Sequence, residues 1–285
     1  MILSFHPCFV ADEQIVLGVR SLGADDHELI RRAEAIILPQ ARSQELYEVC
    51  SRYNARLFPN YEMRLKYPGK VGQNRLFEAL GFPHPETSYW PAVKEFRKAY
   101  PGPDLFPHKL PFLIKEDNSH EAEGIYLVKG NTSLVEALNH ISQKENTGLS
   151  GLITQAYVPC GGDVLRTVLI GKRVCTYWKR PGQPEEIITT LRKGAVIDHQ
   201  WRQDLQEKGK VMAHALSEKT GINLAAIDFV FPLTEKDPAP LFLEINYYFG
   251  RRGLGGTERY YDLLYQAIQE WLVDSGLNPE SVTLV

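Results

Sequence analysis

Three polar residues near the C-terminus have the types and spacing that could hold a metal ion. Asp228 lies on one apolar segment, and Glu244 and Asn246 lie on the next. The turn between the segments, 233–240, is centred near residue 236, so an antiparallel hairpin about that centre places Asp228 directly opposite Glu244. Because side chains alternate between the two faces of a strand, Asn246 shares the face of both carboxylates.

This polar face needs a compensating charge, because two carboxylates placed directly opposite each other destabilise a pair of strands. Magnesium favours oxygen ligands and binds through carboxylates together with phosphate oxygens, so a divalent cation would relieve the repulsion. A solvated strand face with incidental acids explains the same pattern equally well. The opposite face is apolar and is predicted to lie in the core: Ile227, Phe229, Phe231, Leu241, Leu243 and Ile245.

A second hairpin brings basic residues together. Two strand-like segments flank residues 171–172, and a two-residue turn with glycine first is typical of a type II′ hairpin. In that register Arg166 and Lys179 lie on one face, and Arg180 faces Asp163 on the other. Taken singly, each basic residue is also explained by a solvated side chain or by a surface ion pair of little energetic value.

The glycine-rich segment 250–256 stands directly before a predicted last helix and contains Arg251 and Arg252. A glycine-rich helix N-terminus can bind an anion, and two arginines can grip a carboxylate bidentately. We predict both arginines, together with Arg166, as substrate-binding residues. A flexible turn with solvated arginines is the alternative. The chain lacks a G-x-x-x-x-G-K-[ST] segment, which excludes a P-loop.

The elements that must position these residues begin with an alternation of strands and helices, which is typical of a parallel-sheet α/β domain. The expected order is strand Met1–Phe5, helix Asp26–Glu34, strand Ala35–Leu38, helix Ser43–Tyr53 and strand Ala55–Phe58.

From Lys70 onward the pattern changes. A helix over Val71–Leu80 ends at Gly81, and a connector rich in proline and tyrosine runs to about Pro111. The C-terminal half has α+β character, because strands and helices no longer alternate regularly. The later elements are expected at 112–115, 125–128, 152–158, 164–170, 173–179, 224–231 and 241–247 for strands, and at 133–142, 206–219 and 258–271 for helices.

The composition is that of an ordinary globular protein, with 44% hydrophobic and 24% charged residues over 285 positions. A net charge of −3 and the lack of a long basic run argue against nucleic-acid binding. No apolar stretch approaches the roughly 20 residues of a membrane helix, and the apolar start lacks the features of a signal peptide. Four scattered cysteines without C-x-x-C spacing predict reduced thiols, no zinc site and a cytoplasmic location.

The order of these motifs resembles the ATP-grasp superfamily, in the branch of the glutathione-synthetase-like and ribosomal-protein glutamate ligases. The resemblance covers nearly the whole chain and rests on segments 69–75 (GKVGQNR), 81–87 (GFPHPET), 111–115 (PFLIK), 155–158 (QAYV) and 244–246 (EIN), with Asp228. It implies an α/β ATP-grasp architecture. The divisions expected are a small N-terminal parallel-sheet domain over 1–69, a central lid subdomain over 70–157 and a C-terminal subdomain with the metal site over 158–285.

The resemblance also implies roles for single residues. They are Lys70 and Lys115 on the ATP phosphates; Gln155, Ala156, Tyr157 and Val158 around adenine; Asp163 on the ribose; Arg180, Arg192 and Lys193 facing the transferred phosphate; and Asp228, Glu244 and Asn246 on Mg²⁺ or Mn²⁺.

The activity implied is the ATP- and Mg²⁺-dependent joining of a small-molecule or peptide carboxylate to an amine or thiol through an acyl phosphate, and a homo-oligomer is compatible with it. Such a transfer needs positioning and cations more than a protein nucleophile. One departure concerns the segment 116–123, which is acidic where the family has a glycine-rich loop. Two alternatives therefore stay open: a small-molecule kinase on the same fold, and a nucleotide-binding protein without turnover.

Overall fold

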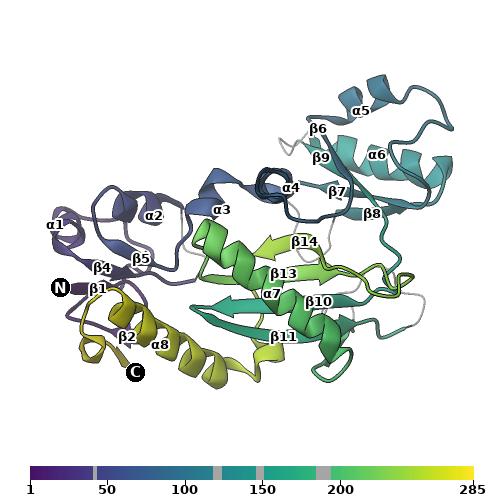
Figure 1. Ribbon diagram of the computed structural model, residues 1–285. Coiled ribbons are helices and arrows are strands. Elements are labelled where there is room, and N and C mark those ends of the chain that lie inside the picture. The colour runs from purple at the N-terminus through teal and green to yellow at the C-terminus, as the bar shows by residue number, and fades with distance from the viewer. Residues whose placement is uncertain (41–43, 118–123, 146–150, 184–193) are drawn as a thin grey trace.

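The computed structural model describes residues 1–40, 44–117, 124–145, 151–183 and 194–285, which form three main sheets joined and covered by helices (Figure 1). A two-stranded ribbon of β2 (Phe9–Val10) and β15 (Thr283–Leu284) ties the two ends of the chain together. The α/β class predicted from the sequence is confirmed.

The N-terminal sheet is parallel, with the strand order β3-β1-β4-β5. All residues of β1 and β4 are buried, as expected of central strands in a covered parallel sheet. The predicted alternation of strands and helices is confirmed. The elements are β1 (Ile2–Ser4), β3 (Glu13–Gln14), α1 (Ala24–Arg32), β4 (Ala35–Ile37), α2 (Gln44–Ser51), β5 (Arg56–Phe58), α3 (Glu62–Lys66) and α4 (Gly69–Leu80).

The central sheet is antiparallel, with the order β6-β9-β7-β8, and it lies at the upper right of Figure 1. The connector expected before Pro111 contains a strand and a helix, β6 and α5, that the sequence pattern did not reveal. β6 forms because it pairs with β9, more than 60 residues away, so no local signal marks it. The elements are β6 (Thr87–Trp90), α5 (Val93–Ala99), β7 (Phe112–Glu116), β8 (Ile125–Val128), α6 (Asn131–Glu145) and β9 (Leu152–Ala156).

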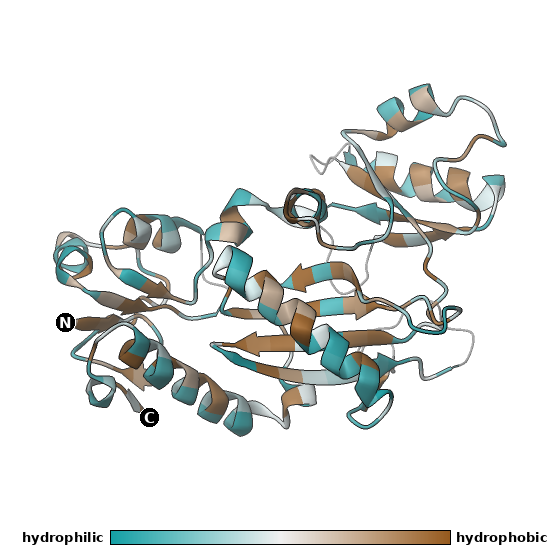
Figure 2. Cartoon of the chain, viewed as in Figure 1, coloured by the Kyte–Doolittle hydropathy of each residue, from teal (hydrophilic) through white to brown (hydrophobic). Residues whose placement is uncertain are grey.

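The C-terminal sheet is antiparallel, with the order β12-β11-β10-β13-β14. Helix α7 packs on one face and α8 on the other, so the central strands are buried on both sides (Figure 2). The turn between β10 and β11 is the predicted two-residue turn, and Gly171 has the positive φ of +62° that it requires. The elements are β10 (Val164–Ile170), β11 (Arg173–Arg180), β12 (Val196–Asp198), α7 (Gln203–Thr220), β13 (Leu224–Val230), β14 (Leu241–Asn246), η2 (Arg252–Leu254), α8 (Thr257–Asp274) and η3 (Pro279–Ser281).

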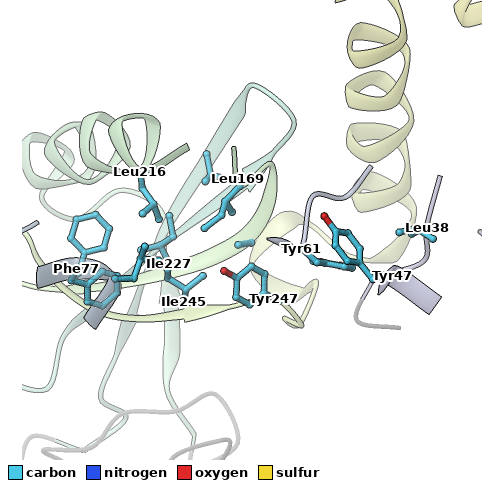
Figure 3. Close-up of a cluster of buried hydrophobic side chains, with 14 of the residues drawn as sticks. Leu38, Tyr47, Tyr61, Phe77, Leu169, Leu216, Ile227, Ile245 and Tyr247 are labelled. Atoms are coloured by element: carbon cyan, nitrogen blue, oxygen red, sulfur yellow. The ribbon is translucent and has the colours of Figure 1, made fainter. Parts of the chain in front are cut away.

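Two hydrophobic clusters of the described residues join the N-terminal and C-terminal sheets, whereas the central sheet has its own core. Figure 3 shows Tyr61 of the N-terminal part beside Tyr247, with Ile227 and Ile245 of the C-terminal sheet next to them. Phe77 of α4 lies in the same core, and the helix also contacts β9 of the central sheet, so it lies between the two bodies. The domain limits at 70 and 158 remain a prediction.

Among the helices that the structure describes, none combines the length and the apolar composition that a membrane span requires. All four cysteines are unpaired, which agrees with the predicted reduced thiols.

Candidate functional site

The hairpin of β13 and β14 sets the two carboxylates opposite each other, as predicted. Asp228 is the cross-strand partner of Glu244. The side-chain amide of Asn246 donates to Glu244 Oε1 at 3.0 Å and lies 3.4 Å from Asp228 Oδ2. The three predicted metal ligands therefore form one cluster on one face of the sheet.

The predicted apolar face is wrong at Leu241 and Leu243. A β-bulge shifts the register, so that Phe229 pairs with Phe242 and Leu243 is the extra residue of β14. Phe242 consequently lies in the core, with its ring centroid 4.6 Å from that of Phe229. Leu241 and Leu243 instead pack beside Val164 in a small cluster outside this core. Strict alternation failed here because a bulge inserts one residue without a marked sequence signal.

Two cations from neighbouring strands hold Asp228, which is only 1% exposed. Arg166 on β10 donates to both carboxylate oxygens, from Nε at 2.8 Å and from Nη2 at 2.7 Å, and Lys179 on β11 donates from Nζ at 2.8 Å. Burial opposes ionisation, but Arg166 and Lys179 together hold the pKa of Asp228 well below its usual range. Asp228 is therefore neutralised by the protein itself, and charge repulsion alone no longer requires a metal ion here.

The two predicted phosphate-binding lysines reach the same cluster from different elements. Lys115 on β7 is 5% exposed and donates from Nζ to Gln155 Oε1 at 2.6 Å. Burial lowers the pKa of Lys115 to about 8, against the attraction of Glu244. Burial also lowers the pKa of Lys70, for which Glu244 is again the strongest attraction. The charge of Glu244 therefore acts on both ammonium groups.

Helix α4 is fixed against the acidic hairpin by Gln73. Its side-chain amide donates to the carbonyl of Ile245 and accepts from the amide of Ile245, both at 2.8 Å. Because β14 is the edge strand of its sheet, Gln73 satisfies backbone groups that no further strand reaches. This docking places Lys70, at the start of the helix, beside Glu244. The sequence did not single out Gln73, since only the tertiary structure brings it to β14.

The acidic segment 116–123 is described only at Glu116 and Asp117, and both carboxylates have partners. Glu116 accepts from the Tyr126 hydroxyl at 2.8 Å and from Lys144 Nζ at 2.9 Å. Asp117 Oδ1 accepts from the Val71 amide at 2.9 Å and so caps the first turn of α4. These two acids serve the structure around the lysines. Residues 118–123 lie outside the described residues.

The predicted adenine-binding residues differ in their backbone partners. The side-chain amide of Gln155 bridges Lys115 and Thr87, and the Ala156 amide donates to the Glu86 carbonyl at 2.8 Å. Within the described residues, the backbone amides of Tyr157 and Val158 have no hydrogen-bond partner. Val158 borders a small apolar cluster formed by Cys160, Val164, Val230, Leu241 and Leu243. This edge could accept a flat apolar ring that also hydrogen-bonds the backbone.

Arg180 faces Asp163, as predicted, and donates to it from Nε at 3.1 Å. Its guanidinium also donates to Asp198 at 3.3 Å and stacks over Trp201, 4.1 Å from the ring centroid. Burial raises the pKa of Asp163, although Arg180 opposes that shift. Asp198 and Trp201 were not recognised from the sequence. The predicted residues Arg192 and Lys193 lie outside the described residues.

The two arginines of the 250–256 segment are in different surroundings. Arg251 stacks over two tyrosine rings, whereas Arg252 is exposed and contacts no other charged or aromatic side chain of the described chain. Gly253 lies against the Tyr177 ring so closely that a Cβ atom there would come within 2.1 Å of it. Only glycine fits at this position, and the contact fixes the segment to β11. The structure does not test either arginine as a substrate ligand.

No protein-family model and no curated protein sequence matches this chain. Solved structures do resemble it. An N5-carboxyaminoimidazole ribonucleotide synthetase in complex with ADP has a TM-score of 0.59 and 13% identity over 85% of this chain, which spans 60% of that protein's length. The D-alanine–D-alanine ligase from Helicobacter pylori has a TM-score of 0.57 and 14% identity, covering 82% of this chain and 71% of that one. A RimK-domain ATP-grasp protein from Sphaerobacter thermophilus has a TM-score of 0.56 and 12% identity, covering 92% and 97% of the two chains.

Proposed function

Because this chain has the ATP-grasp fold, we propose that it is an ATP- and Mg²⁺-dependent ligase that joins a carboxylate to an amine or thiol through an acyl phosphate. The observation that supports this most directly is the convergence of four cations on two facing acids. Lys70, Lys115, Arg166 and Lys179 all come from different elements and surround Asp228 and Glu244. Several buried cations drawn together from distant parts of the chain are suited to bind a polyphosphate.

The nucleotide is proposed to lie between the central sheet and the C-terminal sheet. Adenine would lie on the apolar cluster beside Val158 and hydrogen-bond the free backbone amides there. Its phosphates would extend toward Lys115 and Lys70, whose pKa values are lowered by burial and would be restored by an anion. Asp163 is proposed to contact the ribose.

The donor set fits a magnesium ion that arrives together with a nucleotide. Glu244, Asn246 and the Oδ1 atom of Asp228, which accepts one hydrogen bond, supply oxygen ligands, and magnesium also takes phosphate oxygens. Asp228 Oδ2 is less available, because Arg166 and Lys179 already donate to it. Because Arg166 and Lys179 already neutralise Asp228, the phosphates would supply much of the negative charge that holds the ion. When bound, the ion would withdraw charge from the phosphate oxygens.

The proposed reaction has two steps. An oxygen of the substrate carboxylate attacks the γ-phosphorus, the bond from that phosphorus to the β-phosphate oxygen breaks, and ADP leaves. The lysines hold the transferred phosphate, and Arg180, fixed by Asp163 and Trp201, is proposed to face it from the C-terminal sheet. The amine or thiol then attacks the acyl carbon, phosphate leaves, and the nucleophile loses a proton.

The experiment that tests this function measures thermal stability with ADP, with Mg²⁺ and with both, and then free phosphate on a panel of carboxylates and amines. We expect stabilisation by ADP that Mg²⁺ increases, and no stabilisation by Mg²⁺ alone. A ligase releases one phosphate for each ADP, whereas a kinase forms ADP without free phosphate. The absence of any shift with millimolar ADP overturns nucleotide binding, and ADP formation without phosphate release favours the kinase.

Above pH 8, ADP binding is expected to take up protons. Lys115 has a folded-state pKa of about 8 against an ordinary value of 10.5, so between these values the free protein has lost a proton that the phosphates restore. ADP affinity therefore falls as the pH rises through about 8. Calorimetry in two buffers of different ionisation enthalpy measures the uptake, and Lys115→Met reduces it. The matched control is Lys109→Met, which removes an exposed lysine shortly before β7. Proton release on binding contradicts the prediction.

A further inference from the structure

The carboxyl edge of the N-terminal parallel sheet faces the arginine-containing segment of the C-terminal half. β3 lies on one side of β1 and β4 on the other, so the strand order reverses at β1. Open α/β sheets bind ligands outside the carboxyl ends of their strands at such a point. His6 follows β1 there, and Gln40 follows β4. Gln40 joins the two halves, because its side chain accepts from the Tyr260 hydroxyl at 3.0 Å and donates to the Tyr247 carbonyl at 3.2 Å.

Arg251 is held in place without a carboxylate. Its guanidinium lies 4.6 Å from the ring centroids of both Tyr260 and Tyr261, and it donates to the Tyr261 hydroxyl at 3.1 Å. Within the part of the chain that the structure describes, no Asp or Glu forms an ion pair with it. A guanidinium presents five donors, so most of them remain available to a ligand. The stacking fixes its position before a ligand binds, which reduces the entropy lost on binding.

His6 lies beside this arginine and offers a further donor. It is 5% exposed, and its ring centroid lies 5.8 Å from that of Tyr261. Burial and the nearby charge of Arg251 lower the pKa of His6 to about 4, so the ring is neutral at pH 7. Nδ1 accepts from the Cys8 amide at 3.1 Å, which places the proton of the neutral ring on Nε2. Nε2–H has no partner among the described residues.

The same segment is connected to the acidic cluster. Gly253, two residues after Arg251, lies against the Tyr177 ring, and Tyr177 is the cross-strand partner of Arg166, which binds Asp228. A ligand held by Arg251 is therefore placed on the same body as the proposed metal ligands. A carboxylate gripped by an arginine is a poor nucleophile, because its lone pairs are engaged. The carboxylate that attacks phosphorus must thus be a different one.

We propose that Arg251 and His6 bind a substrate carboxylate that the reaction leaves unchanged. One substrate is then an acid with a second carboxylate, or an amino acid that supplies the amine. This inference rests on the proposed function, because it assigns a further contact to that substrate. It also separates the two neighbouring arginines, since only Arg251 takes part.

The test follows the imidazole signals of the histidines by NMR while glutarate is added to the full-length protein, with the His6 signal assigned through His6→Gln. Glutarate is expected to shift the His6 signal saturably, and Arg251→Gln is expected to weaken this binding at least about tenfold. Arg252→Gln is the matched control, because it removes the same charge one residue away from an exposed side chain. Inorganic phosphate is the comparison anion, and glutarate should bind more tightly.

Three results overturn the inference: no saturable shift of His6, equal weakening by both arginine variants, or tighter binding of phosphate than of glutarate. If Arg251→Gln does not fold, Arg251→Lys keeps the charge but loses the planar fork, and weaker glutarate binding is still expected. ADP binding is measured on the same samples by thermal shift and should be equal in both variants. Loss of the ADP shift in the wild type refutes the proposed function, whereas loss of the His6 response alone refutes only this site.

Discussion

Replacing Glu244 by Gln is expected to reduce phosphate release by a factor of about 100 or more while leaving the protein folded. The side chain attracts both Lys70 and Lys115 and faces Asp228 across the hairpin. Glutamine keeps the oxygen that accepts from Asn246, so the local hydrogen bond at 3.0 Å survives. What is lost is the negative charge that a magnesium ion requires from its ligand.

The measurement compares ADP and phosphate formation by the variant and the wild type, once a substrate is known from the panel. Glu235→Gln is the control, because it makes the same change on an exposed side chain in the turn of the same hairpin. The unfolding temperature of Glu235→Gln should equal that of the wild type, and Glu244→Gln should remain folded at the assay temperature. A Glu244→Gln enzyme that retains the wild-type rate contradicts the metal assignment, whatever its stability.

Replacing Asp228 by Asn is expected to destabilise the fold itself, by roughly 3–5 kcal/mol. Arg166 and Lys179 are both buried and both donate to this carboxylate. Without its charge the two buried cations keep only the weaker attraction of Glu244, and an asparagine amide adds a donor where acceptors are needed. Removing one partner of a buried ionic cluster costs far more than breaking an exposed pair.

Chemical denaturation measures this loss, and Asp237→Asn is its control. Asp237 pairs with Lys208 at 2.5 Å on the surface, where an ion pair contributes at most about 1 kcal/mol. A stability loss for Asp228→Asn as small as that of the control contradicts the view that Asp228 is a structural anion. Together the two acid variants separate the proposed roles: Glu244→Gln is expected to lose activity, whereas Asp228→Asn is expected to lose both activity and stability.

Arg166 is a poor candidate for a substrate ligand, because its guanidinium is already bound to Asp228. The sequence placed it on one face with Lys179, and this is confirmed by their shared contact with Asp228. Its guanidinium donates two hydrogen bonds to that carboxylate. Burial lowers the pKa of Arg166, but the attraction of Asp228 and these hydrogen bonds are together stronger and raise it. The role that remains open to Arg166 is to hold the metal ligand in place.

The sequence by itself determined which polar side chains of the two hairpins face each other. The opposition of Asp228 and Glu244 followed from the period of two along a strand and from the centre of one turn. The facing of Arg180 and Asp163 followed in the same way from the Gly171 turn. These inferences succeeded because a hairpin is local, so its register depends on a few neighbouring residues.

Only the tertiary structure decided what surrounds those faces. Strand β10 pairs with β13 and with β11, and this places Arg166 and Lys179 on Asp228, so that its charge is compensated within the protein. Gln73 reaches Ile245 across more than 170 residues, and the bulge at Leu243 moves a leucine from the core to the other side. Such contacts depend on the order of strands and on the docking of distant elements, which no local periodicity encodes.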